Sequence, residues 1–177
     1  VIYKTLLHSS FASYHDPAEV LRHVNVGFLQ TTQIEGYYLT ASMCIFNPVT
    51  RRGKISSAGH PPALIFRKKE RGYNLHKVLS LHSVMIGVEE NVKYQEMDFQ
   101  LEKGDFLLLS SDGLMEAEGE DGKPLGLEGL SQFMNDYDGY NLLGDLMTHL
   151  ERRSRYVELQ DDVSLVRIEP VGEPDGR

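Results

Sequence analysis

The segment Phe106-Leu107-Leu108-Leu109-Ser110 constrains the fold of this chain more than any other. A half-exposed strand alternates apolar and polar side chains, so four consecutive large apolar residues predict a strand buried on both faces. No apolar run in the chain is longer than this one, and it is far shorter than the ~18 apolar residues of a membrane helix. We therefore expect an interior strand here and no membrane span.

The rest of the chain predicts helices first, then hairpin-like strands, then two more helices and a closing strand. Apolar spacing indicates one helix within residues 1–14, and Asp16-Pro17 begins a second that runs to Gln30, with Asp as N-cap. The other expected elements are strands at 37–46, 54–57, 63–66, 74–79, 94–101, 106–110 and 163–168, and helices at 127–136 and 142–154. Since strands and helices do not alternate strictly, we expect an α+β fold of mostly antiparallel sheets flanked by helices.

Composition excludes several classes of protein. With 177 residues, 41% hydrophobic and 25% charged, the chain is an ordered globular one, and a single domain is the default expectation. A net charge of -8 argues against nucleic-acid partners and is compatible with binding cations. A single cysteine, Cys44, cannot form an internal disulfide, which fits a cytoplasmic protein. Val1 opens the chain inside a helical pattern without a cap, so we expect a fragment; a frayed natural terminus is the alternative.

The buried strand ends in the first candidate site, Ser110-Ser111-Asp112-Gly113. A carboxylate at the end of a buried strand can serve as a ligand held at the rim of the sheet. It can equally form a turn by bonding to its own backbone, because Asp-Gly often marks turns. The spacing alone leaves both readings open.

The second candidate is the adjacent pair Asp161 and Asp162, which enters the apolar strand at 163–168. Two neighbouring carboxylates repel each other unless water or a cation compensates their charge. If this strand lies beside the one ending at Asp112, three carboxylates converge at one rim, and oxygen ligands of this kind suit Mg²⁺ or Mn²⁺. The alternative is a solvated Asp at the start of a strand.

The third candidate is His60, in the segment 58–62 (Ala-Gly-His-Pro-Pro). Two prolines after the histidine hold it in a rigid, non-helical corner. It serves either as a structural hydrogen-bonding residue, the reading we favour, or as a catalyst. The sequence contains no Cys and His cluster at zinc spacing and no phosphate-binding loop.

Taken in order, these motifs resemble the bacterial SpoIIE-type metal-dependent serine/threonine phosphatases, which are related to protein phosphatase 2C. The segment 58–62 is similar to the family's Ala-Gly-His-x-Pro element, 111–113 to its Ser/Thr-Asp-Gly strand end, and 161–164 to its Asp-Asp-x-Ser/Thr strand. The segments 16–25 and 85–87 also resemble family elements. The resemblance covers nearly the whole chain. It implies a phosphatase domain over residues 1–170, followed by a polar tail at 171–177.

The resemblance implies an α/β/β/α sandwich and a metal centre. It assigns Asp112 and Asp161 to metal binding, with Asp162 as a less certain neighbour and His60 as a residue that shapes its turn. The complete domain would hold two Mn²⁺ or Mg²⁺ ions. The family carries a further bridging Asp and a Gly-His-Gly turn before the first long helix, and this chain begins after that point. The incomplete N-terminus also lacks the first strands, so we expect the 177 residues alone to be weakly active or inactive, and exposed strand edges to favour a homodimer.

The family's function is metal-dependent hydrolysis of phosphoserine or phosphothreonine on a regulatory protein. Its usual substrates are phosphorylated anti-sigma-factor antagonists, and its domains follow an upstream sensor or receiver domain. The resemblance implies the same class of substrate and partner here. Two alternatives stay open: a phosphatase-like module that binds a partner without hydrolysis, and an unrelated α+β domain in which these Asp residues only form turns.

Overall fold

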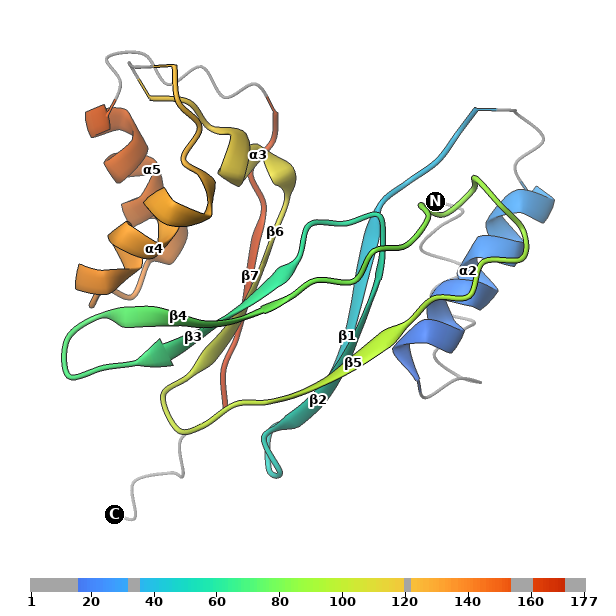
Figure 1. The fold of residues 1–177 in the computed structure, drawn as a ribbon, viewed down its shortest axis with the longest axis horizontal. Coiled ribbons are helices and arrows are strands. Elements are labelled where there is room, and N and C mark those ends of the chain that lie inside the picture. The colour runs from blue at the N-terminus through green and yellow to red at the C-terminus, as the bar shows by residue number, and fades with distance from the viewer. Residues whose placement is uncertain (1–15, 32–35, 120–121, 154–160, 171–177) are drawn as a thin grey trace. The chain divides into compact units, whose positions relative to one another are not determined.

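The computed structural model describes residues 16–31, 36–119, 122–153 and 161–170. The chain divides into two compact units, whose helices and strands are labelled in Figure 1. The first unit comprises Val1–Pro62 and Leu79–Gln100, and the second Ala63–Val78 and Leu101–Arg177. The helix expected within 1–14 and the tail at 171–177 lie outside the described residues.

The first unit is built on a three-stranded antiparallel sheet and one helix. Helix α2 (Pro17–Thr31) precedes the strands β1 (Ala41–Asn47), β2 (Arg52–Ala58) and β5 (Glu96–Gln100), which lie in the order β1-β2-β5. The expected helix from Asp16-Pro17 is confirmed, with Glu19 in its first turn. The first strand begins at Ala41 rather than at residue 37. Within the described residues 36–40 that precede it, Leu39 forms an isolated bridge to Ile86.

Helix α2 is held against the sheet by its apolar stripe. Val20, Leu21 and Val24 are fully buried and pack in one cluster with residues of β1 and β2, including Met43. Asn25 is buried on the same helix, and its amide group accepts the N–H of Gly87 at 2.9 Å and donates to the Glu89 carbonyl at 2.7 Å. A buried amide needs such partners, and these bonds fasten the loop after residue 85 to the helix.

The second unit is built on a four-stranded sheet and three helices. The strands are β3 (Ala63–Lys68), β4 (Tyr73–Leu79), β6 (Phe106–Ser110) and β7 (Leu165–Ile168), in the order β4-β3-β6-β7. Strand β6 runs antiparallel to both β3 and β7. The helices are α3 (Asp112–Glu116), α4 (Gly126–Asp136) and α5 (Leu142–Arg153).

The core of this unit forms around β6. Phe106, Leu107 and Leu108 are each at most 1% exposed, which confirms that the apolar run is an interior strand. The helices α4 and α5 contribute apolar side chains at helical spacing to the same core as Phe106, among them Leu130 and Leu146. The α+β class with antiparallel sheets and flanking helices is therefore confirmed.

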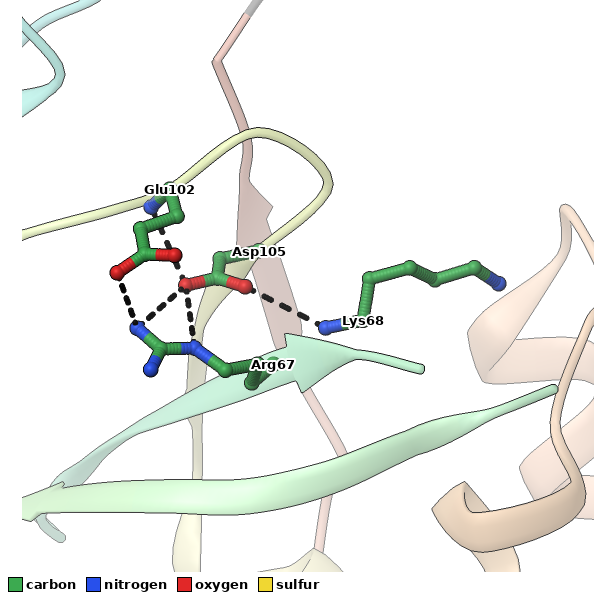
Figure 2. A network of polar contacts seen from close by, with 4 residues as sticks. All are labelled: Arg67, Lys68, Glu102 and Asp105. Atoms are coloured by element: carbon green, nitrogen blue, oxygen red, sulfur yellow. Dashed lines mark hydrogen bonds and ion pairs between the residues drawn. The ribbon is translucent and has the colours of Figure 1, made fainter. Parts of the chain in front are cut away.

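A charge network around the buried Asp105 fixes the turn that leads into β6 (Figure 2). Asp105 is 2% exposed, and one of its carboxylate oxygens accepts from the Arg67 guanidinium at 3.2 Å and from the Glu102 N–H at 3.2 Å. Its other oxygen accepts from the Lys68 N–H at 3.3 Å. Arg67 also pairs with the Glu102 carboxylate at 3.1 Å. A buried carboxylate is tolerated only when its oxygens are satisfied in this way, and the bonds join the end of β3 to the start of β6.

Within the described residues, no helix combines the length and the apolarity needed to cross a membrane.

Candidate metal centre

The carboxylate-bearing segments at 112 and 161 lie side by side in the second unit. Ser110 is opposite Leu165 in the antiparallel register of β6 and β7, so the end of one strand meets the start of the other at one edge. The Ser111 N–H continues the ladder one step further by donating to the Ser164 carbonyl at 3.0 Å. The condition set for the second candidate is met, because the strand entered by Asp161 and Asp162 lies beside the strand that leads to Asp112.

Gly113 brings these two segments into close approach. It is buried, and a Cβ atom at this position would lie 2.8 Å from the Asp162 carbonyl oxygen and 3.1 Å from that of Asp161. Both distances are shorter than ordinary van der Waals contact with a backbone oxygen. A residue without a side chain is therefore required where α3 begins, and backbone oxygens of the second segment face it directly.

The carboxylates themselves are exposed at this edge and bond to their own backbone. Asp112 Oδ1 accepts the N–H of Gly113 at 3.1 Å, and Asp161 Oδ1 accepts the N–H of Asp162 at 2.7 Å. Each bond uses one oxygen, which leaves further lone pairs on both carboxylates. Asp112 therefore makes the bond to its own backbone that is expected of a turn. This bond is compatible with a role as a metal ligand.

The oxygen ligands at this edge are few, but they are of the kind that a hard cation binds. Carboxylate and carbonyl oxygens are the ligands that Mg²⁺ and Mn²⁺ prefer, and two carboxylates plus water are a common arrangement for such ions. Among the residues that the structure describes, no three His, Cys, Asp or Glu side chains gather closely enough to hold a metal ion. The expected convergence of Asp112, Asp161 and Asp162 in one three-carboxylate cluster is therefore wrong. The edge instead offers two neighbouring segments, one with Asp112 and one with the pair Asp161 and Asp162.

His60 lies in the first unit, in the turn that follows β2. Its N–H donates to Ser57 Oγ at 3.2 Å, and the Ser57 hydroxyl donates back to the His60 carbonyl at 3.1 Å. One ring nitrogen, Nδ1, lies 3.3 Å from the Pro61 carbonyl oxygen. These contacts are those of a residue that shapes its turn.

Two features near the Asp112 and Asp161 segments were not singled out from the sequence. The hydroxyl of Ser111 bonds across to the segment 162–164, and the Asp105–Arg67 pair supports the start of β6, the strand that leads to Asp112. Ser111 stood within a motif, and a serine before a helix start is a recognisable signal. The pairing of Asp105 with Arg67 has no local signal, because the partners are 38 positions apart.

Replacing Gly113 with alanine should separate the two segments. The new methyl group meets backbone oxygens that cannot rotate away, and overpacking of this kind costs about 1–3 kcal/mol of the free energy of unfolding. Urea unfolding measures that loss, and titration calorimetry should show weaker Mn²⁺ binding. Gly122→Ala is the control, because a Cβ at that position meets no atom within 4 Å. Alanine there is strained by the positive φ, but this strain should leave the Mn²⁺ affinity unchanged. Wild-type stability and affinity in Gly113→Ala would contradict the close approach.

Comparison with known proteins agrees with these motifs. The sequence profile of Stage II sporulation protein E (SpoIIE) matches residues 1–170. The phosphoserine phosphatase RsbU of Bacillus subtilis (strain 168) is 28% identical over 106 residues, which are 60% of this chain and 30% of RsbU.

Solved structures show the same fold. The PP2C phosphatase domain with a fragment of the regulatory domain of SpoIIE from Bacillus subtilis superposes with a TM-score of 0.71 at 21% identity, covering 93% of this chain and 47% of that one. A second structure is the catalytic domain of the serine/threonine protein phosphatase PstP in complex with two manganese ions. It superposes with a TM-score of 0.62 at 17% identity, and the match covers 94% of this chain and 79% of that one.

This chain thus spans about a third of the length of RsbU and about half of that SpoIIE structure. The resemblance drawn from the segments 58–62, 111–113 and 161–164 is confirmed by the profile match over nearly all of the sequence. The chain belongs to the SpoIIE family and has the fold of the PP2C-type phosphatases.

Proposed function

We propose that this chain forms part of a metal-dependent protein phosphatase domain that hydrolyses phosphoserine or phosphothreonine on a regulatory protein. The observation that carries the proposal is the meeting of the Asp112 and Asp161 segments at one edge of the β6–β7 sheet. The names of two relatives support it, since RsbU is a phosphoserine phosphatase and PstP is a serine/threonine protein phosphatase that binds two manganese ions.

In this proposal Asp112 and Asp161 hold a Mn²⁺ or Mg²⁺ ion, with Asp162 beside them, and the complete domain holds two ions. Bound divalent ions lower the pKa of water and stabilise negative charge on a phosphoryl group. The contribution of this chain is to bring the two segments that carry these exposed carboxylates together at one edge of the sheet. Exposure at the sheet edge suits a protein substrate, because a phosphorylated side chain has to reach the site from outside.

The substrate and the setting follow from the family resemblance. We propose a phosphorylated anti-sigma-factor antagonist-like protein as substrate, an upstream sensor or receiver domain as the source of the signal, and the cytoplasm as the location. The acidic charge of the chain, -8, gives no support to a nucleic-acid partner.

The test uses the full-length protein and a phosphoserine peptide. Phosphate release should require Mn²⁺ or Mg²⁺, should stop with EDTA and should return when the metal is restored. Release that is insensitive to EDTA would overturn the metal-dependent mechanism. Mn²⁺ binding without phosphate release from any phosphoprotein would favour the alternative, a phosphatase-like module that binds a partner without hydrolysing it.

A further inference from the structure

We propose that Ser111 is a positioning residue that clamps the segment 161–164 against the end of β6. The structural part of this proposal stands on hydrogen bonds, and its consequence for metal affinity rests on the proposed function. Ser111 is not itself placed among the metal ligands. Its task is to hold the Asp112 and Asp161 segments at a constant separation.

Three hydrogen bonds from this one residue cross to the other segment. The Ser111 hydroxyl donates to the Asp162 carbonyl at 2.9 Å and accepts the N–H of Ser164 at 2.9 Å. The Ser111 N–H donates to the Ser164 carbonyl at 3.0 Å. The hydroxyl therefore uses both its donor and an acceptor site on backbone groups more than 50 positions away in the sequence.

The hydroxyl makes these bonds in place of the local one that its position predicts. Ser111 is the N-cap of α3, where a serine ordinarily accepts a backbone N–H from the first turn of the helix. No such capping bond forms, and the N–H of Gly113 is bonded by the Asp112 carboxylate instead. The side chain of Ser111 is thus directed to the neighbouring segment and not to its own helix.

The clamp acts at the point where the sheet ends. Beyond the pair Ser110 and Leu165, one backbone bond joins Ser111 to Ser164, and the segment after Ser111 then turns into α3. The partners of the hydroxyl are backbone groups, so these bonds depend on the side chain at position 111 and not on those at 162 or 164. Because the segment 161–164 is largely exposed, water can replace the lost bonds, and removal of the hydroxyl should disturb position more than stability.

The experiment compares three variants of the same protein. Ser111→Ala removes the hydroxyl, Ser111→Thr retains it, and Ser131→Ala is a matched control that removes a serine hydroxyl bonded to the Leu127 carbonyl within α4. Two readouts are needed: the exchange rate of the Ser164 amide proton by NMR without metal, and the Mn²⁺ affinity by titration calorimetry.

Ser111→Ala should accelerate exchange at Ser164 and weaken Mn²⁺ binding by about tenfold, the lower end of the range for residues that orient metal ligands. Ser111→Thr should restore both values, and Ser131→Ala should change neither. Wild-type exchange at Ser164 in Ser111→Ala would overturn the clamp. Faster exchange with unchanged Mn²⁺ affinity would overturn its role in positioning the ligands. A wild-type protein that binds no Mn²⁺ would overturn the proposed function, while the exchange rates would still decide whether the clamp exists.

Discussion

Asp112→Asn is expected to weaken Mn²⁺ binding by about 100-fold or more, beyond the 10–100-fold typical of residues that only orient ligands. Asparagine keeps an oxygen that can accept the N–H of Gly113, so the local turn should persist and the melting temperature should change little. What it loses is the negative charge and one of two oxygens available to a hard cation. Titration calorimetry gives the affinity, and circular dichroism checks the fold.

The same substitution separates the two readings of the Asp-Gly pair. If Asp112 only forms a turn, the amide serves as well as the carboxylate, and Mn²⁺ affinity stays at the wild-type value. Asp138→Asn is the matched control, since it also removes one exposed carboxylate from the second unit but lies outside the β6–β7 edge. Equal losses in both variants would indicate a general effect of charge and would contradict a site at Asp112.

Phe106→Ala is expected to lower the free energy of unfolding by about 3–5 kcal/mol, the usual cost of truncating a fully buried phenylalanine. The ring is completely buried, with its centroid 5.4 Å from that of Phe66 and 4.9 Å from that of Tyr73. The guanidinium carbon of Arg167 lies 4.4 Å from the ring centroid, so the truncation also removes a cation–π contact.

This loss is large compared with the whole stability of a typical domain, about 5–15 kcal/mol. Urea unfolding followed by circular dichroism measures it. Val166→Ala on the neighbouring strand β7 is the control, because this side chain is 55% exposed and its truncation should cost well under 1 kcal/mol. A similar small loss in Phe106→Ala would contradict a core centred on β6. Loss of the folded second unit should also abolish Mn²⁺ binding.

Long helices with a regular spacing of apolar residues were predictable from the sequence. The helices expected at 127–136 and 142–154 are observed at Gly126–Asp136 and Leu142–Arg153, because their buried residues recur at helical spacing. Helix α3 was not predicted. It has only five residues and contains Gly113, so its sequence carries the signal of a turn. The tertiary contacts of its buried residue Leu114 stabilise it instead.

The strand expected at 37–46 shows the opposite error. Tyr37 and Tyr38 have side chains that favour strands, yet they are 60% and 61% exposed and lie outside β1. Strand propensity describes the fit of a side chain to a pleated surface, and these residues have no neighbouring strand in the described part of the chain apart from the single bridge at Leu39.

The sequence by itself determined the type of most elements, the burial of β6 and the three motifs that identify the SpoIIE family. Each of these depends on residues close together in the chain, whose periodicity or order is visible without a structure. The tertiary structure decided which motifs meet. It places the Asp161 segment beside Asp112, and it directs the Ser111 hydroxyl to atoms 51 and 53 positions away. The register between β6 and β7 sets these contacts, and that register follows from how both strands pack in a common core.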